Sequence, residues 1–400
     1  MQRDPPSSDA VTVAVTANNA FATDLFSRVA AGQAGQNVLT SPVSASLALA
    51  MTYAGARGDT ATQMAKALHF DPTAGIADAE NALSQELATV APQALAADKM
   101  QSPETPPSPD DYRLDVVNSV WGQQGTAWAS PFLDVLGKSY GAGVNLEDFV
   151  HAPDAARAAI NSWVSTQTAD KINDLLPSGS IDAMTRVVLV NAIHLKLPWV
   201  EPFDPSQTAP GAFTKGDGTT VQASFMTQGH LFDYGDDGKA QVATFSLAGF
   251  GAKVLLAMPH GDLATYEAEL AADPTEPFEA FDGTEATVHV PKVDFTSPSF
   301  SLESALGAMG MTDAFTDAAD FSGMDGAKDI VIADVLQKAM ISLAETGVEA
   351  AAATAVIGEA LDAPSKIANV TFDHPFVIVI TDPKGAILFL GHVADPTQGS

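Results

Sequence analysis

Cysteine is absent from this chain of 400 residues. Structural disulfides, metal sites built on thiolates and cysteine nucleophiles are therefore excluded. The absence does not identify a cellular compartment. The sequence also lacks any apolar run that approaches the length of a membrane span.

Basic residues are scarce. The chain has 19 lysines and arginines against 49 aspartates and glutamates, which gives a net charge of -30. Such a surface would repel the phosphates of nucleic acids and of anionic lipids, so we expect no nucleic-acid or membrane partner. The charge favours solubility or adaptation to salt over an acidic binding patch.

The motifs of common enzymes are missing as well. The eight histidines are scattered and form no His-Glu-x-x-His pair for zinc. No Gly-x-Ser-x-Gly turn would expose a serine nucleophile, and no glycine-rich loop ends in Lys-Ser or Lys-Thr to hold a phosphate. His374 and His392 lie in or beside strand-like sequence, where a structural role is commoner. We therefore expect neither an enzyme nor a cofactor.

The chain is long enough to bury a large core, since 46% of its residues are hydrophobic, and no linker divides it. A polar N-terminal extension is expected over residues 1–15. Helical spacing of apolar residues predicts helices over 17–32, 42–57, 60–68, 76–97 and 154–176. Four prolines predict a surface loop over 98–111. Apolar and β-branched runs predict strands over 187–195, 241–246, 252–258, 286–290, 376–380 and 386–392.

One segment is unusual. Residues 345–357 read Glu-Thr-Gly-Val-Glu-Ala-Ala-Ala-Ala-Thr-Ala-Val-Ile and lie between two strand-like runs, 329–343 and 371–380. Its small side chains and lack of proline would allow it to be an exposed loop or an extra strand within a sheet. As a strand it would place Val348 and Thr354 on one face and Glu349 on the other. An ordinary alanine-rich linker is the alternative.

The whole chain resembles the serpin family. The resemblance rests on ordered motifs that include Asn37-Val-Leu-Thr-Ser-Pro-Val-Ser, Asn118-Ser-Val-Trp, Leu189-Val-Asn-Ala-Ile-His-Leu-Lys, Met309-Gly-Met-Thr-Asp-Ala-Phe, Asp373-His-Pro-Phe and Ile387-Leu-Phe-Leu-Gly. It implies an α+β fold in a single domain over residues 16–400, with three β-sheets, about nine helices and a reactive-centre loop over 345–365. We expect a member from a prokaryote.

By family mechanism, a serine protease or a papain-like cysteine protease would attack the loop and form an acyl-enzyme. The cut loop would then insert into the central sheet and distort the trapped protease. A non-inhibitory serpin with a carrier, chaperone or storage role is the alternative. Small residues without proline favour inhibition, because they fit a closely packed sheet.

The resemblance also assigns regions. The hinge of the loop maps onto Glu345, Gly347, Val348, Glu349, Ala350, Ala351, Ala352 and Ala353, with Val348 where the family usually has threonine. The shutter beneath the opening sheet maps onto Ser41, Pro42, Ser44, Asn191 and Gln337. The family normally has histidine at the position of Gln337, whose amide can also donate and accept hydrogen bonds. Trp199 matches the tryptophan of the breach, where the loop enters.

Family spacing from Glu345 places the scissile bond at Leu361–Asp362, which would suit a chymotrypsin-like, subtilisin-like or papain-like protease. Ala360–Leu361, which would suit an elastase-like enzyme, is the rival. A trypsin-like target is disfavoured because no basic residue is near the bond.

Residues 76–97, the place of a heparin-binding helix in some serpins, contain no lysine or arginine. We therefore expect no heparin cofactor, and we expect a monomer. An extracellular or periplasmic location is favoured, with a signal peptide removed before this numbering begins. A cytoplasmic location is the alternative.

Overall fold

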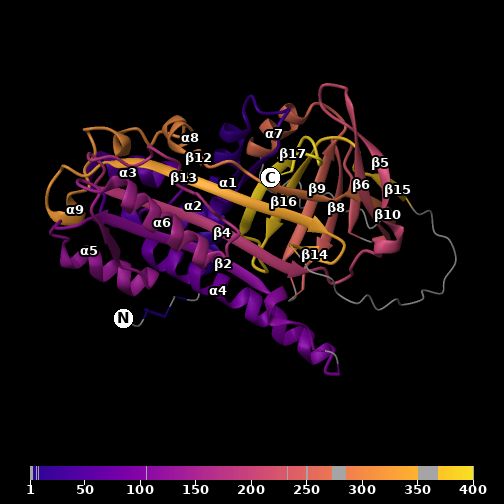
Figure 1. Cartoon of the computed structure of the whole chain (residues 1–400), viewed down its shortest axis with the longest axis horizontal. Coiled ribbons are helices and arrows are strands. Elements are labelled where there is room, and N and C mark those ends of the chain that lie inside the picture. Colours follow the sequence, from indigo (N-terminus) through magenta and orange to yellow (C-terminus); the bar gives the residue numbers. More distant parts are fainter. Residues whose placement is uncertain are drawn as a thin grey trace.

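The computed structural model describes residues 3–5, 7, 9–104, 106–231, 233–248, 251–272, 285–349 and 368–399. Within these residues there are nine α-helices and three β-sheets, as the α+β prediction requires (Figure 1). The helices are α1 (Ala10–Ala30), α2 (Pro42–Tyr53), α3 (Gly58–Ala67), α4 (Ile76–Gln101), α5 (Ser130–Val135), α6 (Pro153–Gln167), α7 (Leu263–Ala272), α8 (Glu303–Ala308) and α9 (Ser322–Asp325).

The largest sheet has seven strands in the order β11-β13-β14-β4-β2-β3, with β12 also pairing with β13. We call it the large sheet. Its strands are β2 (Arg113–Gln123), β3 (Val144–Glu147), β4 (Val187–Pro198), β11 (Val293–Thr296), β12 (Phe300–Ser301), β13 (Ile332–Ala344) and β14 (Gly347–Val348).

Two smaller sheets lie toward the end of the molecule opposite α5 and α9 (Figure 1). The first has the order β1-β17-β16-β9-β8-β7 and the second has the order β15-β10-β6-β5. The strands of the first are β1 (Val38–Thr40), β7 (Tyr234–Asp236), β8 (Ala240–Ser246), β9 (Lys253–Pro259), β16 (Phe376–Thr381) and β17 (Ile387–Val393). Those of the second are β5 (Ala209–Thr214), β6 (Thr220–Leu231), β10 (Ala286–Pro291) and β15 (Ala368–Thr371).

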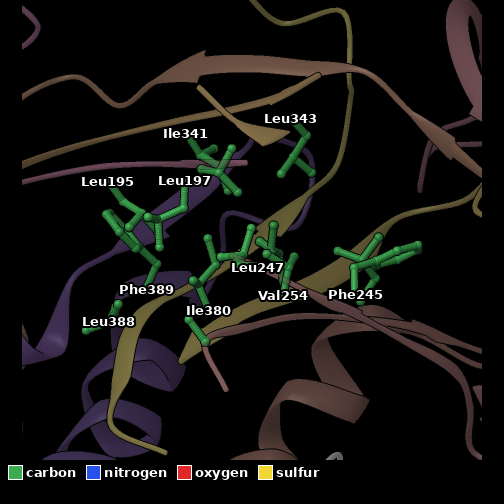
Figure 2. Close-up of a cluster of buried hydrophobic side chains, with 14 of the residues drawn as sticks. Leu195, Leu197, Phe245, Leu247, Val254, Ile341, Leu343, Ile380, Leu388 and Phe389 are labelled. Carbon is green, nitrogen blue, oxygen red and sulfur yellow. The ribbon is translucent and has the colours of Figure 1, made fainter. Parts of the chain in front are cut away.

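The large sheet is covered on both faces, which explains the nearly continuous apolar sequence of β4. Val188 and Val190 of β4 pack with Ile160 and Val164 of α6 on one face. On the other face, side chains of β4 and β13 join those of the six-stranded sheet in the main core. Figure 2 shows this core, including Leu195, Leu197, Phe245, Leu247, Val254, Ile341, Leu343, Ile380, Leu388 and Phe389.

Several predicted boundaries are wrong. Helix α1 begins at Ala10, so residues 10–15 belong to it and not to a polar extension. Helix α4 continues to Gln101, and a 3₁₀ turn occupies residues 109–111, so the predicted loop over 98–111 is shorter. Helix α6 ends at Gln167, well before residue 176. Among the described residues, no helix is long and apolar enough to cross a membrane.

Candidate functional site

The site is the end of the large sheet where β13 and β4 separate. These parallel strands pair directly from Ile332 to Ala339, with Gln337 opposite Asn191. Beyond that stretch β14 lies between them and is antiparallel to both. Val348 is opposite Leu343 on one side and Leu197 on the other. The segment after β13 therefore turns back and already occupies two positions of an additional strand.

Gly347 is required by a close approach of two backbones. A Cβ atom at this position would lie 2.3 Å from the carbonyl oxygen of Leu197 and 2.6 Å from Cα of Pro198, which side chains cannot relieve by moving. The next side chain, Val348, is only 2% exposed and joins the main core. Sequence alternation predicts that a strand here places Val348 and Glu349 on opposite faces, and in the structure Val348 is on the face that joins the main core.

Trp199 fixes the turn that connects β13 to β14. Its indole Nε1–H donates to the carbonyl oxygen of Ala344 at 2.8 Å, and its backbone N–H donates to that of Thr346 at 3.1 Å. The ring is 5% exposed and packs against the rings of Phe203 and Phe245. The predicted breach residue is thus bonded directly to the turn that leads from β13 into β14.

Glu345 anchors the same turn. Its carboxylate accepts hydrogen bonds from Lys292 Nζ at 2.7 Å and from Thr208 Oγ1 at 2.9 Å. Its backbone carbonyl accepts one from the N–H of Phe203 at 2.8 Å. Burial raises the pKa of this carboxyl, but these partners lower it more, so the net pKa is below its ordinary value. The ion pair with Lys292 joins the turn to the segment between β10 and β11.

Glu349 is the last hinge residue that the structure describes. Its backbone has a φ of 49°, in the left-handed region, while its N–H donates to the carbonyl oxygen of Ser342 at 2.7 Å. Its carboxylate contacts His194 Nε2 and forms an ion pair with Lys171. His194 Nδ1 lies 3.3 Å from an oxygen of Asp115. A carboxylate of the hinge is therefore bound to a buried histidine of β4.

Sequence reasoning does not identify His194 or Lys171 as functional residues. One signal for His194 is present, because it is the one titratable residue within the run from Val187 to Leu195, which is apolar except for Asn191 and His194. A buried strand has room for a titratable side chain only where partners satisfy it.

The predicted shutter residues lie together under the paired part of β13 and β4. Gln337 Oε1 accepts from the N–H of Ser41 at 3.0 Å, and its Nε2 donates to the carbonyl oxygen of Ser41 and to Asn191 Oδ1 at 2.8 and 2.9 Å. Pro42 begins α2, and Ser44 Oγ donates to the carbonyl oxygen of Ala192 at 3.3 Å. The amide at 337 thus both donates and accepts.

The remaining site predictions lie outside the described residues. They are the hinge residues Ala350, Ala351, Ala352 and Ala353 and the alternative scissile bonds formed by Ala360, Leu361 and Asp362. The functional roles of hinge, shutter and breach stay predictions. No group of three or more metal-ligating side chains occurs in the described part of the chain.

Comparisons with known proteins place this geometry in context. Residues 16–396 match the family model described as Serpin (serine protease inhibitor). The leukocyte elastase inhibitor of Bos taurus is 35% identical over 95% of this chain and 98% of its own length. Human Serpin B3 is 32% identical over 95% of this chain and 98% of its own.

A solved structure, that of Serpin48 from the insect Tenebrio molitor, has a TM-score of 0.76 and 29% identity over 96% of this chain and 98% of that one. Serpin48 is described as a highly specific serpin. The named relatives come from animals, so they give no support to a prokaryotic origin. The curated relative from Bos taurus is named as a protease inhibitor, in agreement with an inhibitor rather than an enzyme.

Proposed function

The chain belongs to the serpin family, and we propose that it traps a serine protease as an acyl-enzyme by inserting its cleaved loop between β13 and β4. The observation that carries this proposal is the position of β14 in the gap between the two strands. Insertion would extend β14 along a path that it has already entered.

The register of β14 supports an extension without slippage. Gln337 pairs directly with Asn191, and Leu343 and Leu197 both lie opposite Val348. At both places the residue number on β13 exceeds that of its partner position on β4 by 146 (337 − 191 and 343 − 197), so the two strands have the same alignment with and without β14 between them. From Val335 and Leu189 onward, an inserting strand can therefore separate β13 from β4 while each keeps its alignment; the pairing shifts by one residue only between Ile332 and Val335.

This register assigns a partner to each loop residue in the inserted state. Six residues beyond Val348, Thr354 would lie opposite both Gln337 and Asn191, on the face that carries the shutter. The hydroxyl of Ser41 is buried there and has no hydrogen-bond partner among the described residues. The one hydroxyl-bearing side chain between residues 348 and 358 would thus reach the polar part of the core.

The register also limits where the protease can cut. Val187, the first residue of β4, would lie opposite Gly358. A bond before Gly358 would leave too little chain to fill the gap. Both candidate bonds, Leu361–Asp362 and Ala360–Leu361, lie beyond this limit, so the proposal holds for either.

We propose that the target has an apolar specificity pocket, of the chymotrypsin, subtilisin or elastase kind. Leu361 and Ala360 supply suitable side chains, and the curated relative named leukocyte elastase inhibitor favours the elastase-like class. A papain-like cysteine protease is the second candidate. We further propose that the protein acts as a monomer outside the cell. We also propose that it acts without heparin, since residues 76–97 carry no basic side chain.

The test is to mix the protein with chymotrypsin, elastase, subtilisin and papain and to examine the products on denaturing gels. We expect a covalent complex with at least one serine protease and release of the C-terminal peptide. The mass of that peptide distinguishes the two candidate bonds, because their products differ by one leucine. Complete cleavage with no complex and undiminished protease activity throughout the panel would refute inhibition and favour a carrier or storage role.

Thr354→Arg separates insertion from simple binding. The change puts a charge on the buried face of the inserted strand, which opposes insertion. We expect cleavage at the same bond with little or no complex. The matched control, Ser365→Arg, adds the same charge beyond both candidate bonds and should keep the complex. Equal complex formation by the two variants would contradict the assigned register.

A further inference from the structure

Glu349 marks the point where the pre-formed strand ends. Its N–H is already paired with β13, yet its positive φ departs from the extended conformation that a continuing strand needs. A non-glycine residue with positive φ is uncommon and is retained when its surroundings hold it. For the loop to enter further, the backbone at Glu349 must change its conformation.

The side chain of Glu349 is held on two sides. His194 of β4 and Lys171, which follows α6, both contact its carboxylate, which is only 12% exposed. Other charged groups belong to pairs nearby. Asp115 of β2 lies between His194 and Arg113, and its carboxylate is 3.9 Å from the guanidinium of Arg113. Lys196 of β4 pairs with Asp111 at 2.9 Å.

His194 faces a carboxylate at each ring nitrogen. An imidazolium donates from both nitrogens, so it can bind Glu349 and Asp115 together. A neutral ring has one N–H and must leave one carboxylate facing a lone pair. Because the ring is 4% exposed, solvent cannot readily replace the lost partner. Within this group of charges, histidine is the residue type that normally titrates near neutral pH.

We propose that His194, with Lys171, is a positioning group that latches Glu349 and makes the depth of loop insertion depend on pH. The proposal rests on the insertion mechanism proposed above and adds its regulation. With His194 protonated, the latch stops the strand after Val348. When His194 loses its proton, one of its two carboxylates is released and further insertion becomes easier.

The direction of the pH effect follows from the two groups. Burial lowers the pKa of His194, but its hydrogen bonds with Asp115 and Glu349 and their charges raise it more, so the net pKa is above the ordinary 6.5. Burial raises the pKa of Glu349, but His194 and Lys171 lower it more, so it stays ionised at neutral pH. As long as Glu349 is ionised, the latch is therefore complete up to pH 6.5, and it weakens as pH rises through the raised pKa of His194.

The absence of cysteine allows a direct test on the uncleaved protein. Ala353→Cys provides a single thiol for an environment-sensitive fluorophore at the last residue of the predicted hinge. We expect a pH titration to show a transition with a midpoint above 6.5. The transition should be lost in His194→Gln and in Glu349→Gln, each made in the labelled background. His69→Gln, which changes a histidine paired with Asp24 instead, should keep it.

Two results would overturn the latch. One is a wild-type titration without any transition from about pH 6 to pH 9. The other is an unchanged transition in Glu349→Gln, which removes the carboxylate without altering the buried histidine. Because this experiment uses no protease, its failure would leave the proposed inhibition intact, and a failure of inhibition would not affect its readout.

A second measurement connects the latch to function. The number of inhibitor molecules consumed per protease trapped is measured for wild type and His194→Gln at each pH with the same enzyme. In wild type this number should fall as pH rises, because faster insertion leaves less time for the protease to escape. Dividing this number for wild type by the same number for His194→Gln cancels the pH dependence of the protease itself. A ratio that stays constant with pH would contradict the proposal.

Discussion

Glu80 offers the sharpest prediction of stability. This residue of α4 is 1% exposed and lies near the hydroxyl of Ser46 of α2, at 3.4 Å. Its other carboxylate oxygen has no partner among the described residues. Burial raises the pKa of Glu80 to about 8, although the hydrogen bond with Ser46 lowers it slightly. The carboxyl is therefore neutral in the folded protein at pH 7.

The size of the effect follows from linkage. In the unfolded chain Glu80 ionises near 4.5, and in the folded chain near 8. Between these values the unfolded state binds fewer protons, so the free energy of unfolding falls by about 1.4 kcal/mol per pH unit. The total loss by pH 8 is roughly 5 kcal/mol, which corresponds to about 6 °C in the unfolding midpoint of a chain of this length.

Replacing Glu80 by glutamine removes this penalty while keeping the shape of the side chain. We expect Glu80→Gln to match wild type near pH 5 and to become progressively more stable than wild type toward pH 8. Thermal unfolding midpoints at several pH values would measure the difference. Glu303→Gln, at an exposed glutamate of α8, is the control and should show no such trend. If the unfolding midpoints of Glu80→Gln and wild type differ by the same amount at every pH, the reasoning is refuted.

Three further predictions concern the large sheet. Gly347→Ala should expel β14, because the added Cβ meets backbone atoms, and hydrogen exchange at the amide of Val348 should become faster. Gln337→Ala should lower the free energy of unfolding by about 2–4 kcal/mol, measured by urea unfolding, since it leaves two buried backbone groups of Ser41 unpaired. Lys292→Met should make stability less dependent on pH below about 4.5, because it removes one of the partners that lower the pKa of Glu345 while leaving the hydrogen bond from Thr208.

The sequence predicts much of the large sheet, but unevenly. The apolar and β-branched run from Val187 predicts β4, and the structure confirms it. Strand β2 gives a weaker signal, because Arg113, Asp115 and Asn118 interrupt its apolar pattern. It is a strand since ten of its residues pair with β4, a tertiary effect that local sequence does not carry.

In the predicted hinge, too, the sequence predicts some features and not others. Alternation predicts that Val348 and Glu349 face opposite sides of a strand, because this property depends on the chain's own spacing. The contact between Glu349 and His194 joins residues 155 apart in sequence. No local pattern indicates such a pair, and it becomes visible only when β13 and β4 are placed side by side.

The position of β14 determines how the large sheet would open. Two strands that slide past each other must break all their hydrogen bonds at once, whereas strands separated from one end break them in succession. Because β14 already occupies one end of the gap between β13 and β4, opening would proceed as peeling rather than shearing. Each step would exchange one ladder of hydrogen bonds for two, so the sheet gains bonds as it widens. The first step of this opening would be the change of backbone conformation at Glu349.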